Sequence, residues 1–270
     1  MSYKVVRLGD VADIVTGNTP SKSNDEFWTN GIIPFVTPGE LKYNSTNYVE
    51  SASDNVTELA LSTARAIPKN SVMVCCIGSL GKLGIASRDL ITNQQINSVV
   101  FKEEVAHYKF GYYAISLLRN EMEKIAPSTT VKIINKTLFS NLQISLPPLD
   151  IQKKIADTLD KAQELIDKRK EQISALDKFL ENLFLDMFGD PVNNPMGWEV
   201  KRLKSISTKI LSGNTPKGGN QVYVDKGITF FRSQNVWRNK LILEDIAFID
   251  EKTHKSMNCI CQPKSTPSFN

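Results

Sequence analysis

Hydrophobic residues recur at alternating spacings of three and four positions along the segment between Asp150 and Gly189. This spacing is the heptad pattern of a helix that packs lengthwise against another helix. The segment contains no proline or glycine before Gly189, and Pro191 follows it. Asp150 suits the start of such a helix and Gly189 suits its end. The residues of this helix seam are Ile155, Leu159, Ala162, Ile166, Ile173, Leu176, Leu180, Leu183 and Met187, and Arg169 is the one polar residue in the series.

A helix of about 38 residues has a length of roughly 57 Å, because each residue adds 1.5 Å. A seam of that length cannot be buried by the helix itself. Two interpretations fit: the helix is a spacer that lies on its own domain, or it forms an antiparallel pair with a second helix, within the chain or between chains. The narrow and regular seam favours the helix pair.

The segment before this helix has shorter hydrophobic runs, which are typical of a β-rich domain with a few helices. The run VMVCCI at Val72–Ile77 predicts a buried strand, and KVVRL, the end of ITNQQINSVVF and the alternating LQISL predict three more. Between Tyr108 and Ala126 the hydrophobic residues lie near helical spacing and predict one amphipathic helix that Pro127 ends. The glycines of GSLGKLG follow the buried strand and predict a turn.

The chain repeats part of this first domain after the long helix. GNTP begins at Gly17 and again at Gly213, 196 residues later, and WEVKRLKSISTKILSGNTP restates VVRLGDVADIVTGNTP. Pro263-Lys264 stands where Pro68-Lys69 stood, and the sequence stops six residues later. We therefore expect a second copy of the domain that is cut short before its central strand.

Together these patterns predict an α+β fold in three parts. A β-rich domain covers residues 1–148, a long coiled-coil-type α-helix covers 149–189, and the start of an incomplete second copy covers 190–270. A repeat of this length is the size of a whole domain with its connector, and it exceeds the 20 to 50 residues of solenoid repeats.

Composition and charge place few limits on the partners. Lys and Arg number 14 against 14 Asp and Glu in residues 1–150, and 12 against 6 in residues 191–270, so the net charge of +4 comes from the carboxyl end. A domain that grips DNA phosphates usually has a larger basic excess. No apolar run has the length of a membrane span, and the amino terminus lacks a secretory signal, so we expect a cytoplasmic protein with reduced thiols.

The sequence contains no convincing catalytic or metal site. Asn194-Pro195-Met196-Gly197 faintly resembles the signature of adenine methyltransferases, but the second proline, the aromatic residue and a glycine-rich cofactor loop are missing. Asp190 with Glu199-Val200-Lys201 fits a loose nuclease pattern, yet the first copy has no acid at the corresponding place. GSLGKLG lacks the spacing and the Ser or Thr of a phosphate-binding loop, although its backbone amides remain candidates for a phosphate contact. We expect no cofactor, no metal and no catalytic residue.

Several stretches resemble the specificity subunits of type I restriction-modification enzymes. They are KVVRLGDVADIVTGNTPSK, IPKNSVMVCCIGSLGKLGIA, TNQQIN and, most specifically, the junction LFSNLQISLPPLDIQKKIADTLDKAQELIDKRKEQISALDKFLENLFLDMFGDP. The resemblance covers residues 1 to about 260.

The resemblance implies that each β-rich domain is a target recognition domain that reads one half of a split sequence in double-stranded DNA. The long helix would hold two such domains apart and dock methyltransferase subunits and, through them, restriction subunits. The specificity subunit itself is not catalytic in these adenine-methylating complexes. A full subunit has two complete domains and two antiparallel helices, so this chain resembles a half-subunit, which would be a truncated variant or would form a homodimer through its helix.

The resemblance does not identify the residues that contact DNA. Side chains that read base edges are Arg, Lys, Asn, Gln, Ser and Thr. The loops of the first domain supply the candidates Lys22, Asn24, Ser79, Lys82, Asn93, Gln94, Gln95, Thr129, Thr130 and Lys132. The adjacent glutamines also suit a role in capping backbone groups. The alternative from another class is a scaffold protein without a DNA role, which the neutral first domain and the helix seam would also fit.

Overall fold

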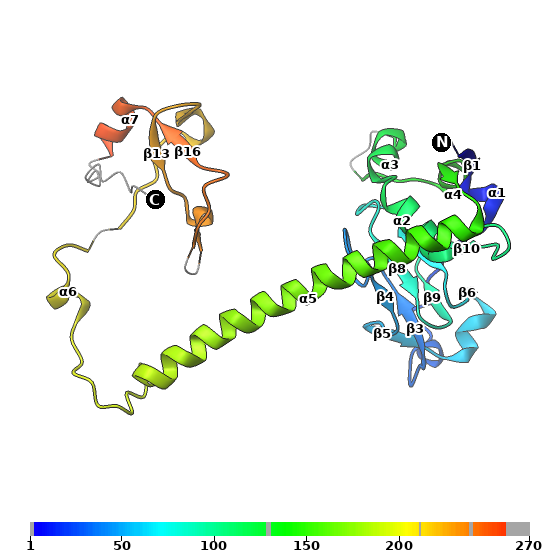
Figure 1. Cartoon of the computed structure of the whole chain (residues 1–270), viewed down its shortest axis with the longest axis horizontal. Coiled ribbons are helices and arrows are strands. Elements are labelled where there is room, and N and C mark those ends of the chain that lie inside the picture. The colour runs from blue at the N-terminus through cyan, green and yellow to red at the C-terminus, as the bar shows by residue number, and fades with distance from the viewer. Residues whose placement is uncertain (1–2, 128–130, 211, 238–239, 258–270) are drawn as a thin grey trace. The chain divides into compact units, whose positions relative to one another are not determined.

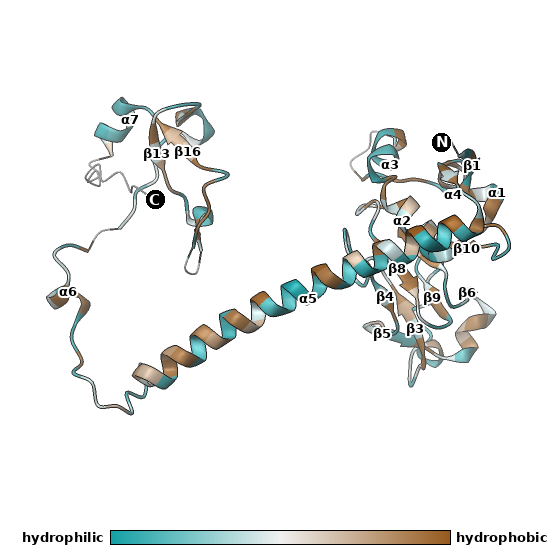
Figure 2. Cartoon of the chain, viewed as in Figure 1, coloured by the Kyte–Doolittle hydropathy of each residue, from teal (hydrophilic) through white to brown (hydrophobic). Residues whose placement is uncertain are grey.

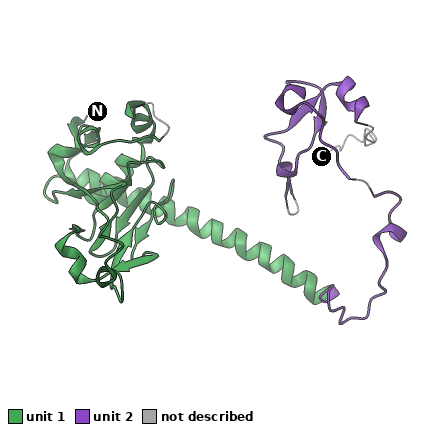
Figure 3. Ribbon diagram, turned by 180° about the vertical axis from the view of Figure 1, so that it is seen from behind, with its two compact units in different colours: residues 1–187 green, residues 188–270 purple. Residues whose placement is uncertain are grey.

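The computed structural model describes residues 3–127, 131–210, 212–237 and 240–257. The chain divides into two compact units, Met1–Met187 and Phe188–Asn270, which Figure 3 shows in green and purple. In the described ranges no helix has both the length and the apolar character needed to cross a membrane.

Two β-sheets form the centre of the first unit (Figure 1). The five-stranded sheet has the order β2 (Ala12–Thr16), β10 (Ile96–Phe101), β7 (Val72–Cys75), β8 (Leu83–Ala86) and β4 (Tyr48–Val49). The four-stranded sheet has the order β5 (Asp54–Val56), β3 (Ile33–Val36), β9 (Leu90–Thr92) and β6 (Ala66–Ile67). The pairs β4–β8 and β3–β9 are parallel and the other pairs are antiparallel. The short helical turns η1 (Asp25–Phe27) and η2 (Glu58–Ser62) precede β3 and β6.

The predicted central strand β7 is fully buried, and its side chains alternate between two hydrophobic clusters. Val72, Val74 and Cys76 belong to a cluster with the helices, whereas Met73 and Cys75 belong to a cluster with the four-stranded sheet. Cys75 and Cys76 are free thiols, and burial raises the pKa of Cys76 to about 12. A thiol with such a pKa is inert near neutral pH.

Helices cover the outer face of the five-stranded sheet. These are α1 (Leu8–Val11), α2 (Tyr108–Ser116), α3 (Arg119–Ile125) and α4 (Lys136–Ser140). They contribute Leu8, Ile115, Met122 and Phe139 to the first cluster. The strand β1 (Lys4–Arg7) pairs antiparallel with β11 (Gln143–Leu146), so the two ends of this domain lie side by side.

The single helix expected from Tyr108 to Ala126 is wrong, because the structure divides it into α2 and α3. The amide of Leu118 donates to the carbonyl of Ile115, only three residues back, so the backbone tightens there and a new helix begins at Arg119. Leu117 fits the helical period but is 83% exposed. The spacing of the hydrophobic residues alone therefore did not reveal the break between α2 and α3.

The long helix α5 (Leu149–Phe188) is continuous over 40 residues, as the seam predicted. It begins one residue before Asp150, which lies in the first turn, where an acidic side chain is favourable. Gly189 follows the last turn with a φ of +76°, the left-handed conformation that commonly ends a helix.

The buried side chain of Gln152 fixes the first turn of α5 to the domain. Its oxygen accepts from the amide of His107 at 2.9 Å, and its nitrogen donates to the carbonyls of Val105 and Pro147 at 3.1 and 2.8 Å. Two turns later, Asp160 accepts from Lys109 Nζ at 2.5 Å and from the Tyr113 hydroxyl at 2.7 Å. The direction in which α5 leaves the domain is therefore set by specific polar contacts.

Replacing Gln152 by alanine is expected to destabilise this junction strongly. The change removes the partner of one amide and two carbonyls, of which one bond is buried and two are part-buried, and a buried group left without a partner costs about 1–3 kcal/mol. We expect the free energy of unfolding in urea to fall by about 3 kcal/mol or more. The matched control is Gln172→Ala on the exposed part of the same helix, where we expect a change within about 0.5 kcal/mol. Equal effects of the two changes would contradict the anchoring role.

The second unit starts with α6 (Leu203–Ile206) and contains a three-stranded sheet of β12 (Tyr223–Val224), β16 (Ala247–Ile249) and β13 (Ile228–Phe230). The remaining elements are η3 (Gly219–Val222), η4 (Ser233–Asn235), the hairpin β14 (Val236–Trp237) and β15 (Lys240–Leu241), and α7 (Glu251–Ser256). The antiparallel pair β13–β16 resembles the pair β3–β5 of the first unit: Ile228 faces Ile249, and Ile33 faces Val56, which precede them by 195 and 193 residues.

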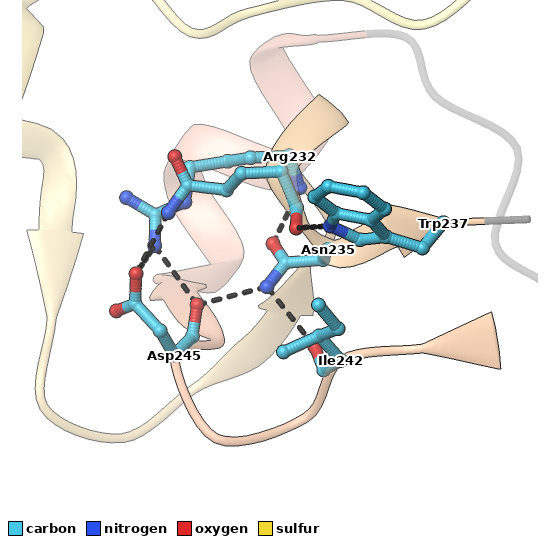
Figure 4. A network of polar contacts seen from close by, with 6 residues as sticks. Arg232, Asn235, Trp237, Ile242 and Asp245 are labelled. Carbon is cyan, nitrogen blue, oxygen red and sulfur yellow. Dashed lines mark hydrogen bonds and ion pairs between the residues drawn. The ribbon is translucent and has the colours of Figure 1, made fainter. Parts of the chain in front are cut away.

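A polar network follows β13 in the second unit (Figure 4), and one of its hydrogen bonds resembles a hydrogen bond of the first unit. The amide of Arg232 donates to the side chain of Asn235 at 2.9 Å, as the amide of Thr37 donates to Glu40 at 2.8 Å. Asn235 also donates to the carbonyls of Ile242 and Asp245. The second unit thus contains a strand pair and a loop contact that resemble those of the first unit at offsets of 193 to 195 residues, close to the 196 residues of the GNTP repeat.

Candidate nucleic-acid interface

Loops that carry most of the predicted DNA-contact residues meet at one end of the first domain. This is the end at which β2 and β7 stop and β4, β8 and β10 start, as their registers show. Backbone hydrogen bonds connect the loops to one another: Cys76 to Gln95, Gly78 to Lys132, and Asn93 to Val36. The fold therefore places Ser79, Lys82, Gln94, Gln95 and Lys132 at one end of the first domain.

The Asn93–Gln95 turn is partly structural and partly available for contact. Asn93 is 8% exposed, and its side chain accepts from the amide of Gln95 and donates to the Gln95 side chain at 2.9 Å. Gln94 is exposed, and its side-chain oxygen accepts from the Thr19 hydroxyl at 2.6 Å. Asn93 thus stabilises the turn, and Gln94 is the residue of the three that faces solvent most.

The two predicted residues on the GNTP loop have different surroundings. Asn24 caps η1, because its side chain accepts from the amide of Glu26 at 3.1 Å. Lys22 is exposed, and its Nζ lies 5.5 Å from the ring centroid of Trp28. Trp28 packs edge-on against Phe35 and donates to the carbonyl of Ser21. The indole is therefore part of the packing between this loop and β3.

The backbone amides of the glycine turn, residues 76–82, are used within the domain, and Cys76 and Leu80 are buried. The amides of Gly78, Ser79, Leu80, Gly81 and Lys82 all donate to carbonyls of the same domain, at 2.9 to 3.4 Å. The phosphate contact by these amides that the sequence left open is therefore not available in this structure. Ser79 is exposed, and Lys82 Nζ donates to the carbonyl of Pro38 at 3.3 Å.

Sequence reasoning missed two residues beside this turn, Tyr43 and Arg119. The guanidinium carbon of Arg119 lies 4.3 Å from the ring centroid of Tyr43, and Lys82 Nζ lies 5.8 Å from the same centroid. We call these three residues the cation–tyrosine cluster. The residues are far apart in the chain, and no local pattern signals their contact.

The remaining candidates lie in the segment that follows Pro127. Thr129 and Thr130 lie outside the described residues. Lys132 is exposed, and its carbonyl accepts from the amide of Gly78. The segment is thus tied to the glycine turn by its backbone.

The helix seam is exposed along most of α5. Ile155 is half-buried at the domain and Ala162 is exposed, and the other seven seam residues are between 38% and 62% exposed. From Lys168 to Phe188 every residue of the helix is exposed. Leu165 and Phe179, each one position before a seam residue, are 64% and 59% exposed and widen the apolar stripe. Figure 2 shows hydrophobic residues recurring along this helix.

Comparison with known proteins gives a consistent result. The family model described as "Type I restriction modification DNA specificity domain" matches residues 2–176. The chain is 28% identical over 269 residues to the specificity subunit of the MjaIX type I restriction enzyme of Methanocaldococcus jannaschii, covering 92% of this chain and 61% of that protein. It is 30% identical over 167 residues to the EcoR124I/EcoR124II specificity subunit of Escherichia coli, covering 58% and 40%.

Solved structures share the fold. The S subunit of a type I restriction-modification system from M. genitalium matches 87% of this chain and 57% of its own, with a TM-score of 0.50 and 16% identity. A chain from a study of the assembly and conformational transition of a type I system matches 67% and 43%, with a TM-score of 0.55 and 19% identity.

The chain spans about three fifths of the length of the MjaIX specificity subunit, since it covers 61% of that protein. The family model matches well over half of the chain and includes the whole β-rich domain and most of α5. The chain therefore belongs to the family of type I restriction modification DNA specificity domains.

Proposed function

We propose that this chain is a sequence-specific DNA-binding subunit that directs methyltransferase and restriction subunits to a split DNA target. The domain at 1–148 reads one half-site, and the helix at 149–189 sets the separation from a second reading domain. The chain itself catalyses no step, and it acts in the cytoplasm.

One observation carries this proposal: a domain with polar loops at one end is attached by buried polar contacts to a stiff, seam-bearing helix. About 28 residues of α5 follow Asp160, and at 1.5 Å each they extend roughly 42 Å. Successive turns of B-DNA are about 34 Å apart, so a helix of this length is suited to span two half-sites. A flexible linker would not fix that distance.

We further propose that the seam is covered by α5 of a second copy of this chain, in antiparallel orientation. Such a dimer is symmetric and carries two identical reading domains. It would recognise a palindromic target with a spacer in the middle.

The test is co-purification of the full chain with the methyltransferase subunit encoded beside it, followed by mapping of methylated adenines. A split palindromic target supports the dimer with two identical domains. Methylation at an asymmetric target would show a different second reading domain and contradict the dimer.

Salt dependence separates this proposal from the scaffold alternative. A DNA reader loses affinity steeply as the salt concentration rises, because bound phosphates release counterions. We expect the full chain to bind duplex DNA with such a dependence, measured by fluorescence anisotropy. If the chain does not bind duplex DNA at low salt, even with its methyltransferase partner, the proposed function is contradicted and the scaffold alternative is favoured.

A further inference from the structure

The cation–tyrosine cluster brings together three segments of the first domain. Tyr43 lies in the loop before β4, Lys82 ends the glycine turn, and Arg119 begins α3. In the part of the chain that the structure describes, Lys82 forms no ion pair with a carboxylate. Two cations thus share the ring of one tyrosine at the end of the domain where the loops meet.

The Arg119 side chain is held in place on three sides. Its guanidinium is stacked on Tyr43, and its Nε donates to Glu123 at 3.1 Å. Gly81 lies on another side, with a φ of +78°, and a Cβ there would be 3.0 Å from Cγ of Arg119. A side chain that is already ordered loses less conformational entropy when it binds a ligand.

The guanidinium of Arg119 still has hydrogen-bond donors that can bind a ligand. Neither terminal nitrogen of Arg119 has a hydrogen-bond partner among the described residues. A guanidinium fork matches phosphate oxygens with two parallel hydrogen bonds. Lys82 adds a compact second charge and uses one of its three donors for Pro38. Because Glu123 forms an ion pair with Arg119, the two cations leave a local charge of +1, which favours an anion over the neutral edge of a base.

We propose that Arg119 and Lys82 together bind one phosphate of the DNA backbone and so fix the position of the domain on its half-site. This inference rests on the proposed function and assigns two residues that position the domain on DNA. The domain has as many acidic as basic side chains, 14 of each in residues 1–150, so its attraction to DNA must come from local clusters such as this one.

The experiment uses the full chain and a fluorescent duplex of about 30 base pairs with arbitrary sequence, because a phosphate contact is independent of sequence. Anisotropy titrations at several salt concentrations give the slope of log affinity against log salt. We expect Arg119→Gln to lower the affinity about tenfold and to reduce that slope by about 0.9. Lys82→Gln should reduce the slope by a similar amount and leaves α3 unchanged.

Arg88→Gln is the matched control. It removes the same charge from an exposed residue in the turn after β8, at the opposite end of that strand from Lys82. For Arg88→Gln, the slope of log affinity against log salt should equal that of the unchanged chain. Tyr43→Leu removes the stacking surface without a change of charge, and we expect a smaller loss of affinity with the slope retained.

The outcomes are distinguishable. If Arg119→Gln and Lys82→Gln behave like Arg88→Gln while the unchanged chain binds DNA with steep salt dependence, the cluster proposal is wrong and the proposed function stands. A second duplex carries the target sequence identified by methylation mapping. If Arg119→Gln weakens binding to this duplex and leaves binding to the arbitrary sequence unchanged, Arg119 contacts a base and the phosphate assignment is overturned. If the unchanged chain does not bind DNA, both proposals fail.

Discussion

Replacing Leu176 and Leu180 by lysine is expected to convert the chain from a dimer to a monomer. Both residues lie in the exposed seam, at 62% and 59% exposure in the single chain. Covering one leucine side chain contributes about 1.5–3 kcal/mol, and a symmetric dimer covers four of them. The loss, with the cost of placing lysine against an apolar helix, should weaken association by at least about 10⁴-fold. Sedimentation equilibrium at micromolar concentration measures the mass directly.

The control for this prediction places two lysines on the opposite face of the same helix. Ala175→Lys and Asn182→Lys also introduce two lysines, but at exposed positions away from the seam. This variant should remain a dimer, and both variants should retain a folded first domain. A Leu176→Lys, Leu180→Lys variant that stays dimeric would refute the role of the seam. An unchanged chain that is monomeric would refute the dimer itself.

The second large effect is expected from Gly17→Ala, and its control is the same change at Gly213. A Cβ at Gly17 would lie 2.3 Å from the carbonyl oxygens of Thr92 and Asn93, whereas a Cβ at Gly213 has no neighbour within 4 Å. Backbone oxygens of the sheet cannot move aside easily, so we expect Gly17→Ala to lower the free energy of unfolding by about 3 kcal/mol or more. Gly213→Ala should change it by less than about 0.5 kcal/mol.

Hydrogen exchange read by mass spectrometry shows where this effect falls. We expect Gly17→Ala to lower the protection of β2 and β10, because the amide of Gly17 donates to the carbonyl of Ile96 at the start of β10. Gly213→Ala should leave both strands as protected as in the unchanged chain. If the two changes lower the protection equally, the contact of Gly17 with the carbonyl oxygens of Thr92 and Asn93 is not the reason that a glycine is required there.

The elements with a long or strict pattern were the ones that sequence could predict. The seam predicted α5 nearly to its ends, and the apolar run at Val72–Ile77 predicted a strand buried on both faces. Adjacent residues of a strand point to opposite faces, and Cys75 and Cys76 accordingly belong to different clusters. These predictions rest on periodicity, which the backbone geometry of helices and strands imposes locally.

Features that depend on contacts between distant segments could not be predicted in this way. Gln152 reads as an ordinary polar residue of a helix, yet it is buried because Val105, His107 and Pro147 surround it. The stacking of Arg119 on Tyr43 joins a loop and a helix that only the folded sheet brings together. The break after α2 depends on a backbone bond and not on the spacing of side chains.

The pairing of β1 with β11 affects how the domain is made. During synthesis, Lys4–Arg7 leaves the ribosome long before its partner Gln143–Leu146. At about 5–20 residues per second the first strand waits roughly 7–28 s for the second. An edge strand left open for that time is exposed to pairing with other chains, and charged residues at its ends oppose such pairing. Lys4 and Arg7, at the two ends of the strand, are therefore suited to protect the nascent protein from aggregation until the domain closes.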